Sequence, residues 1–235
     1  MKLQYLGDSK DSFKWDYHDY LAQELCYPLL NIVLMMTPDD ASNDGKSHPS
    51  LFPARGEIVE FCKQLREKRN IDALRRLPET TGSRYTVKLH NGSTFITNQN
   101  RMQYFSGLSA TTKQLLFLDP DNGFEPEKRY SDKHVLYSDI ASLLDQISDD
   151  SVISVFQHSR RKPFVEDFAR IKHRLYSGYA TAIYWNLLMF VAIGKSQKVI
   201  TQVSEVNKKY CKNTPGQSHC LTTASTRGGL IRGIV

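Results

Sequence analysis

Apolar and polar positions alternate along the chain in a way that separates helices from strands. Helical spacing of apolar residues predicts helices over 13–25, 57–69, 138–147, 163–175 and 197–211. Short, nearly unbroken apolar runs predict buried strands over 29–36, 115–118 and 152–156, and one or two more over 180–193. Asn91-Gly92 separates two β-prone segments, 85–89 and 94–97, which predicts a β-hairpin.

This order of elements predicts an α/β protein with a Rossmann-like three-layer fold, a mainly parallel sheet and a small β-hairpin insertion. Residues 1–212 are expected to form one such domain, and the polar residues 213–235 a flexible C-terminal tail. In sheets of this kind, ligands bind beyond the carboxyl ends of the strands. Polar clusters that directly follow strands are therefore the first candidates for a functional site.

Composition adds a charge asymmetry to this picture. Of the 235 residues 40% are hydrophobic and 24% charged, ordinary globular values that exclude disordered, collagen-like and coiled-coil proteins. The net charge is +6, but residues 1–150 hold 18 basic and 22 acidic side chains, whereas 151–235 hold 13 basic and 3 acidic ones. The acidic first part and the basic last part of the chain favour a carboxylate-bearing site joined to a surface that prefers anions. A merely solubilising surface is the alternative.

The sequence also bears on location. Met1 to Asp19 contains four aspartates and no apolar core, so no secretory signal is expected. The apolar run 180–193 is shorter than the roughly 20 residues of a membrane span. We expect a cytoplasmic protein without membrane contact; the sequence leaves the oligomeric state open.

The sharpest candidate site follows the predicted strand 115–118, in Asp119-Pro120-Asp121-Asn122-Gly123. A carboxylate directly after a buried strand is held at the edge of the sheet, and Gly123 permits a positive φ or a close approach of the backbone. Asp119, Asp121 and Asn122 are therefore candidate catalytic residues. The same oxygens suit Mg²⁺, and a turn chosen only for its geometry is the plain alternative.

A second cluster, Thr37-Pro38-Asp39-Asp40, follows the strand predicted over 29–36. A nucleotide-like cofactor would bind here, yet the glycine-rich turn typical of such sites is absent and the first glycine is Gly45. Thr37, Asp39 and Asp40 are candidate contacts to an altered cofactor pocket, or the aspartates are metal ligands.

A third cluster lies near the start of the sequence. Asp8, Asp11 and Lys14 recur at a spacing of three and share one face if the segment is helical. They are candidate cofactor or catalytic residues. Asp8 is equally suited to cap a helix, and the lysine to a solvated ion pair.

The fourth cluster follows the strand predicted over 152–156. His158 has the chemistry of a general acid or base. Arg160, Arg161 and Lys162 are expected to open a helix, where a phosphate would bind; a solvated basic face is the alternative. Four aromatics are further candidates for base contacts, although most suit a core: Tyr104, Phe105, Phe124 and Tyr137.

With these residues assembled, the chain resembles an uncharacterised bacterial and phage family over roughly residues 4–165. The motifs that carry the resemblance are Tyr5-Leu6-Gly7-Asp8 with Asp11 and Lys14, Thr37 to Asp40, Asp119 to Gly123, and Gln157-His158 with Arg161. No settled activity comes with that family.

More remotely, the chain is similar to the ribosomal-RNA adenine-N6 methyltransferases that carry an Asp-Pro-Pro-Tyr motif. This resemblance implies S-adenosylmethionine near Lys14 and residues 37–40, and a target amine at residues 119–122. The chain departs from the pattern in two ways. The glycine-rich cofactor loop is missing, and Asp-Asn replaces Pro-Tyr, so the base-stacking aromatic is lost unless Phe124 replaces it.

The leading hypothesis is an S-adenosylmethionine-dependent, methyltransferase-like enzyme that acts on nucleic acid or a nucleotide at the carboxyl edge of the sheet. The expected catalytic residues of this enzyme are Lys14, Asp119, Asp121, Asn122 and His158. The expected cofactor-binding residues are Asp8, Asp11, Thr37, Asp39 and Asp40. The residues expected to bind phosphate are Arg160, Arg161 and Lys162. The first alternative is a nuclease or phosphodiesterase that uses Mg²⁺ or Mn²⁺. Its metal ligands would be Asp8, Asp39, Asp119 and Asp121, with Lys14 and His158 assisting. The second alternative is an inactive nucleic-acid-binding module of bacterial defence or phage counter-defence.

Overall fold

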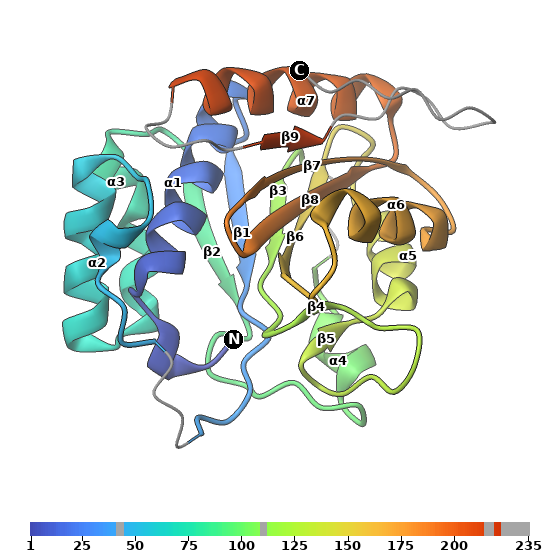
Figure 1. The fold of residues 1–235 in the computed structure, drawn as a ribbon, viewed down its shortest axis with the longest axis horizontal. Helices are drawn as coiled ribbons and strands as arrows, with labels where there is room; N and C mark the ends of the chain where they lie inside the picture. Colours follow the sequence, from blue (N-terminus) through green and yellow to red (C-terminus); the bar gives the residue numbers. More distant parts are fainter. Residues whose placement is uncertain (41–44, 109–111, 214–218, 222–235) are drawn as a thin grey trace.

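Short buried strands from the whole length of the chain meet in one mixed sheet (Figure 1). The computed structural model describes residues 1–40, 45–108, 112–213 and 219–221. In the order of the sheet, its strands are β2 (Thr86–His90), β1 (Leu29–Val33), β3 (Leu115–Leu118), β6 (Val152–His158), β8 (Leu188–Gly194), β7 (Tyr179–Trp185) and β9 (His219–Leu221). Two shorter strands, β4 (Gly123–Phe124) and β5 (His134–Val135), pair with each other.

Strand directions confirm a mainly parallel sheet. β1 lies between β2 and β3 and is parallel to both, and β3 is parallel to β6. β8 runs antiparallel to its neighbours β6 and β7. The chain passes from β1 to β2 on one side and then returns to β3 on the other. The carboxyl ends of β1 and β3 therefore form the switch point where open α/β sheets bind ligands.

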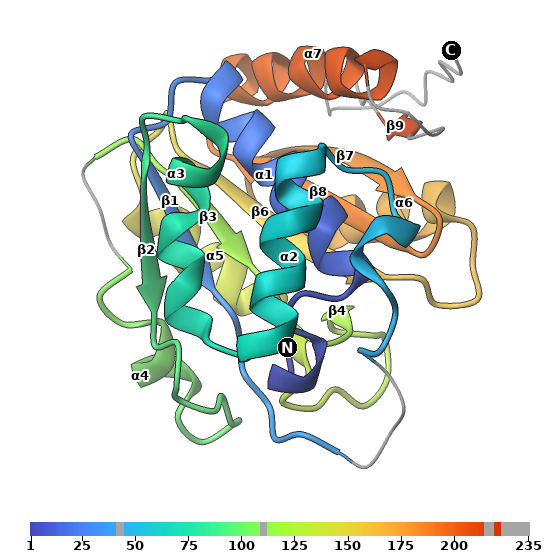
Figure 2. The ribbon, with the colours of Figure 1, turned by 90° about the vertical axis from the view of Figure 1, so that its left-hand side faces the viewer.

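Helices cover both faces of the sheet, which confirms the three layers (Figure 2). The helices of one face are α1 (Ser9–Glu24), α2 (Gly56–Lys68), α3 (Leu77–Thr81) and α7 (Gln197–Asn213). Those of the other are α4 (Arg101–Phe105), α5 (Tyr137–Gln146) and α6 (Phe164–Arg174). Three short 3₁₀ segments complete the described elements: Leu3–Tyr5, Pro49–Leu51 and Ile71–Arg76.

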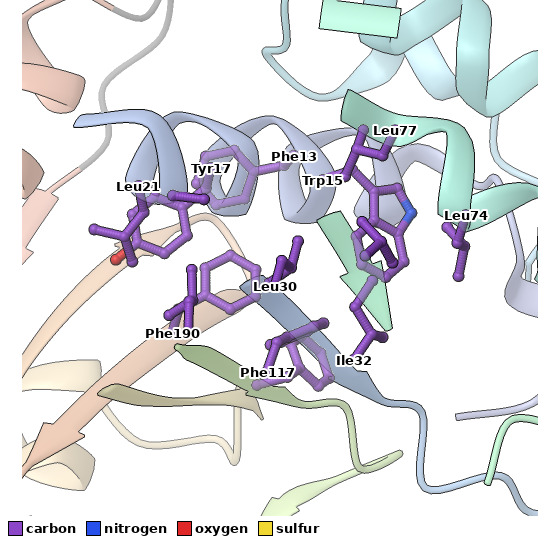
Figure 3. Packing of buried hydrophobic residues seen from close by; sticks show 14 of the residues in the cluster. Phe13, Trp15, Tyr17, Leu21, Leu30, Ile32, Leu74, Leu77, Phe117 and Phe190 are labelled. Carbon is purple, nitrogen blue, oxygen red and sulfur yellow. The ribbon is translucent and has the colours of Figure 1, made fainter. Parts of the chain in front are cut away.

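Helix α1 is the centre of the first face (Figure 3). Trp15 meets the ring of Phe117 edge to face at 5.8 Å, and Tyr17 stacks on Phe190 at 5.3 Å. Aromatic side chains buried in these geometries contribute both apolar area and ring–ring attraction. They fix α1 against β3 and β8, and with it the polar residues at its start.

The hairpin expected over 85–97 is wrong. β2 pairs in parallel with β1, and Phe95 bridges Met36 instead of folding back onto β2. Asn91 takes a positive φ of 50° and starts a turn, as the Asn-Gly signal indicates, but the turn only redirects the chain. The Asn-Gly signal reflects only the conformation of a few neighbouring residues, whereas all five residues of β2 pair with the edge of β1. A hairpin does exist between β7 and β8, in the region where one or two late strands are predicted.

Two further expectations concern the ends of the domain and the membrane. Within the predicted tail, Asn213 ends α7 and β9 pairs with β7, while most other tail residues lie outside the described part of the chain. In the described residues, no helix combines the length and apolar character needed to cross a membrane.

Candidate active site

The site begins with the capping of α1. The Oδ1 atom of Asp8 accepts hydrogen bonds from the main-chain nitrogens of Lys10 at 2.9 Å and Asp11 at 3.1 Å. Asp8 is therefore the N-cap, which satisfies two otherwise unpaired N–H groups. The cap starts the helix four residues before the predicted position and brings Asp11 and Lys14 onto its first turns.

Lys14 joins α1 to the end of β3 through buried ion pairs. Its Nζ donates to Asp11 Oδ1 and to Asp119 Oδ2, both at 2.7 Å. All three residues are at most 4% exposed. Burial by itself lowers the pKa of Lys14, but the two carboxylates outweigh it, and the net pKa is raised. The ammonium group therefore stays charged and anchors Asp119.

Three oxygen atoms at the switch point converge on one nitrogen. The amino group of Met1 donates to the main-chain oxygens of Met35 at 2.8 Å and Asp119 at 3.1 Å, and lies 2.8 Å from Asp121 Oδ1. Thr37 orients Asp121 by donating its hydroxyl hydrogen to Oδ2. We call these three acceptors, Met35 O, Asp119 O and Asp121 Oδ1, the amine cradle.

The ends of β1 and β3 hold the cradle in shape. The main-chain nitrogen of Asp119 donates to Val33 O at 2.9 Å, which extends the strand pairing by one residue. Met35 has a φ of 45°, a left-handed conformation that is strained for a bulky side chain. The turn after β1 is thus tight although the glycines typical of it are absent. Burial raises the pKa of Asp121, but the adjacent amino group outweighs it, so the net pKa is lowered.

Asp39 and Asp40 lie at the same edge but outside the cradle. Asp39 Oδ1 accepts from the main-chain nitrogen of Gln4 at 3.2 Å. Asp40 forms an ion pair with Lys2 and accepts from the side-chain amide of Gln4. Both aspartates are exposed. They tie the loop after β1 to residues 2–4.

The turn after β3 packs against the end of β6. Gly123 has a φ of 96°, and a Cβ placed on it would lie 2.2 Å from Oε1 of Gln157. The same Oε1 accepts from the main-chain nitrogen of Phe124 at 2.9 Å. The predicted positive φ at Gly123 is confirmed, and the group that its backbone closely approaches is the side chain of Gln157. Asn122 is exposed, with its side-chain nitrogen 3.5 Å from Nε2 of His134.

Phe124 does not replace the missing base-stacking aromatic. It is fully buried and stacks on Tyr137 at 5.4 Å. The other aromatics considered for base contacts are buried too: Tyr104, Phe105 and Tyr137. All four rings belong to the hydrophobic core on the side of α4, α5 and α6, which is the role that the sequence favours for most of them.

His158 is the last residue of β6 and lies half-buried one strand away from Asp119. Its Nδ1 lies 3.1 Å from the main-chain oxygen of Ser159. The ring of Phe156 is 6.3 Å from the His158 ring and 5.5 Å from Lys14 Nζ. His158 therefore shares the edge with the Lys14 cluster, with Phe156 beside both.

The basic run Arg160–Lys162 precedes α6 instead of opening it, because the helix starts at Phe164 with Pro163 as its N-cap. Arg161 and Lys162 are exposed. Arg160 is partly buried, and its Nη2 donates to Gln157 Oε1 at 3.4 Å.

The proposed metal ligands do not converge. Asp8 caps α1, Asp39 is exposed beside Gln4, and Asp119 is paired with Lys14. In the part of the chain that the structure describes, no group of three or more His, Cys, Asp or Glu side chains is placed to hold a metal ion. Among the described residues, Asp8, Asp39 and Asp119 therefore have separate partners and do not form one ligand set.

Three contributors to the site are not among the predicted site residues. The amino group of Met1 occupies the cradle, the main-chain oxygen of Met35 belongs to it, and Gln157, named above only as part of a motif, braces the turn after β3. Main-chain oxygens carry no sequence signal, because every residue has one. Gln157 had a signal, its position at the end of a predicted strand, where it stands beside the more conspicuous His158.

Comparisons with known proteins leave the family of this chain open. No family model matches it, and no curated protein matches it. Among solved structures, it is similar to human methyltransferase-like protein 13 in complex with SAH, with 11% sequence identity and a TM-score of 0.35 over 88% of this chain and 93% of that one. So weak a likeness supports no argument. The fold assignment rests on the strand order and the layers alone.

Proposed function

We propose that the protein is an S-adenosylmethionine-dependent, methyltransferase-like enzyme whose acceptor is an amino group on nucleic acid or a nucleotide. The observation that carries the proposal is the amine cradle, in which the ends of β1 and β3 direct three oxygens at one amino nitrogen. A nucleobase amine presents the same kind of donor. The amino group of Met1 stands in for it.

The cradle has the chemistry that amine alkylation requires. An amino group that donates its hydrogens to Asp119 O and Asp121 Oδ1 is held with its lone pair directed away from these oxygens. The carboxylate of Asp121 stabilises the positive charge that develops on the nitrogen. Lys14 fixes Asp119 and is a positioning residue. S-adenosylmethionine, when bound, supplies the methyl group.

The residues at the end of β1 fit the polar groups of such a cofactor. The hydroxyl of Thr37 and the carboxylates of Asp39 and Asp40 suit amino and ribose hydroxyl groups, and the left-handed turn at Met35 brings main chain to the site. Residues 1–5 cover this edge through contacts of Lys2 and Gln4 with the two aspartates. In our proposal, ligands displace this cover on entry.

The metal-dependent alternative lacks a fitting donor set, since Asp119 and Asp121 each bond to a cationic nitrogen. We derive no step through a metal ion. The cofactor titration described next distinguishes the methyltransferase-like enzyme from an inactive nucleic-acid-binding module.

The test is calorimetric titration with S-adenosylmethionine and its demethylated product, followed by adenosine or inosine monophosphate in the presence of that product. Inosine monophosphate is a matched ligand because a carbonyl replaces the exocyclic amine. We expect both cofactor forms to bind. Adenosine monophosphate should bind at least about tenfold more tightly than inosine monophosphate, because a hydrogen bond to a charged group contributes about 1.5–3 kcal/mol.

The Asp121→Asn variant should lose this preference, while Asp145→Asn, an exposed change on α5, should keep it. Failure of both cofactor forms to bind refutes the proposal. Binding of Mn²⁺ alone would then favour the metal-dependent alternative. Salt-sensitive nucleic-acid binding without any cofactor would favour an inactive module.

A further inference from the structure

Three arginine side chains gather beside the turn that carries the cradle. The guanidinium of Arg174 lies over the ring of Tyr137, 4.4 Å from its centroid, and its Nη1 donates to Pro126 O at 3.3 Å. Arg170 Nη1 lies 3.4 Å from the Tyr137 hydroxyl. Arg160 reaches the same turn through Gln157, which bonds to Phe124. Arg170 and Arg174 come from α6, and Arg160 from the loop before it.

In the described part of the chain, carboxylates lie within ion-pair distance of two of the three arginines but not of Arg160. Asp167 pairs with Arg170 at 2.7 Å, and Glu125 lies 3.9 Å from Arg174. Within the described residues, Arg160 has no carboxylate oxygen within ion-pair distance. Burial lowers the pKa of Arg160; the negative charge of Asp167 opposes this, and the positive charges of Arg170 and Arg174 add to it. An anion at this place would give Arg160 the ion pair that it lacks among the described residues.

The segments around the three arginines extend the positive charge. Residues 125–130 and 160–176, which we call the basic rim, contain eight Lys and Arg but four Asp and Glu. Two tyrosines of the rim are exposed, Tyr130 at 51% and Tyr176 at 81%. Tyr130 follows Arg129 directly, and Tyr176 comes two residues after Arg174. Arginines interleaved with exposed aromatic rings are typical of surfaces that bind single strands.

We propose that the basic rim binds single-stranded nucleic acid, with Arg160, Arg170 and Arg174 on backbone phosphates and Tyr130 and Tyr176 stacking on unpaired bases. A guanidinium binds phosphate oxygens in a bidentate way, which fixes the strand as well as attracting it. A single strand leaves its base faces free for the tyrosines, whereas a duplex hides them.

The position of the rim links it to the cradle. Glu125 lies two residues after Gly123, so a strand on the rim runs past the turn that presents Asp121. A base must leave a duplex before an enzyme can modify its amine, and a single strand meets this condition from the start. In this respect the inference rests on the proposed function, because it supplies the substrate class for the same site.

The test measures binding of the full chain to fluorescent oligonucleotides of about 12 nucleotides by anisotropy, as single-stranded RNA, single-stranded DNA and their duplexes. Single strands should bind at least tenfold more tightly than duplexes. Affinity should fall with salt at a log–log slope near −2, as about three phosphate contacts require. Comparing the affinities for single-stranded RNA and single-stranded DNA shows which of the two the protein prefers.

Variants locate the surface. Arg160→Gln combined with Arg174→Gln should weaken single-strand binding more than tenfold and flatten the salt dependence. The matched control is Arg75→Gln with Arg76→Gln, whose side chains are at least half exposed near α3, on the opposite side of the molecule from α6 (Figure 1). Tyr176→Ala should weaken binding about tenfold, and Tyr176→Phe should keep wild-type affinity because its ring still stacks.

Equal affinity for single strands and duplexes would overturn the proposal, as would equal losses in the rim and control variants. Binding to vesicles of anionic lipid without binding to oligonucleotides would assign the rim to a membrane instead. Cofactor titration of the wild-type protein separates this inference from the proposed function, because it measures the cradle edge without depending on the rim. If S-adenosylmethionine fails to bind but single strands do, the rim stands and the methyltransferase proposal falls.

Discussion

Lys14 illustrates how a charged residue becomes part of a core. Its ammonium group has two carboxylate partners inside the protein, Asp11 and Asp119. Burying an ion is costly unless it is paired, and removing one member of a buried group leaves the others unpaired. The position of Asp119, and hence of the amine cradle, depends on this balance.

Lys14→Met should lower the free energy of unfolding by about 3–5 kcal/mol near neutral pH, the usual effect of leaving buried charges unpaired. Burial already raises the pKa of Asp119, with Lys14 and the amino group of Met1 opposing it, so the variant should take up protons at this site more readily. Its loss of stability should therefore shrink as the pH falls. Urea unfolding at several pH values measures this. Lys10→Met, at a partly exposed position of the same helix, is the control. Equal losses in the two variants would contradict the role of the buried pairs.

Asp8 gives the stability of the protein a pH dependence of its own. Burial and the neighbouring Asp11 raise its pKa to about 6, above the unfolded value of 3.8. The folded state therefore binds this proton more tightly, and the contribution of Asp8 to stability is present below about pH 4 and lost as the pH rises through 6.

The Asp8→Asn variant should keep the helix cap and lose that dependence. At neutral pH it should be more stable than the wild type by up to about 3 kcal/mol, since one pKa unit corresponds to about 1.4 kcal/mol. Thermal unfolding between about pH 4 and 7 tests the sign. The prediction would be contradicted if the wild type were more stable than Asp8→Asn at neutral pH and if the stability of both proteins changed equally with pH. The ionised carboxylate of Asp8 would then not destabilise the folded state.

At the scale of elements, the turn after β3 depends on one glycine. Gly123 combines a positive φ with direct contact to the end of β6, where a Cβ would lie 2.9 Å from Gln157 Cα. Gly123→Ala should destabilise the protein by more than the roughly 1–2 kcal/mol that a left-handed conformation costs by itself. Denaturant unfolding measures the difference.

The control for this prediction is Gly82→Ala. Gly82 has a φ of 66°, but no atom lies within 4 Å of the position its Cβ would take. It therefore isolates the cost of the backbone conformation. If both variants lose the same amount, the close approach to Gln157 has no energetic weight.

Individual helices and strands differ in how well the apolar pattern of the sequence predicts them. β3 and α5 lie where the apolar pattern predicts them, because a short apolar run and an amphipathic helix each satisfy their burial locally. The apolar spacing predicts α1 only from residue 13, because the first turn of the helix, residues 9–12, consists of polar residues. Ser9, Asp11 and Ser12 of that turn are buried through hydrogen bonds and an ion pair, which an apolar pattern does not register.

At the scale of the whole molecule, the strand order decides which clusters meet. Lys14, Thr37, Asp119 and Asp121 come together because β1 and β3 are neighbours. His158 is one strand further along, and Asp39 and Asp40 point to the N-terminal segment. The sequence placed all of them except Lys14 at strand ends, and it had no means to rank them by distance from the switch point.

By itself, the sequence determined the α/β class, most of the strands and helices, and the motifs at the carboxyl edge, because hydrophobic periodicity and turn chemistry act over a few neighbouring residues. The tertiary structure decided the pairing of β2 with β1, the burial of Phe124 and the cradle built from main-chain oxygens. These depend on contacts between residues far apart in the chain. Such contacts arise from the competition of all segments for the same sheet edges and the same core, and no local pattern encodes its outcome.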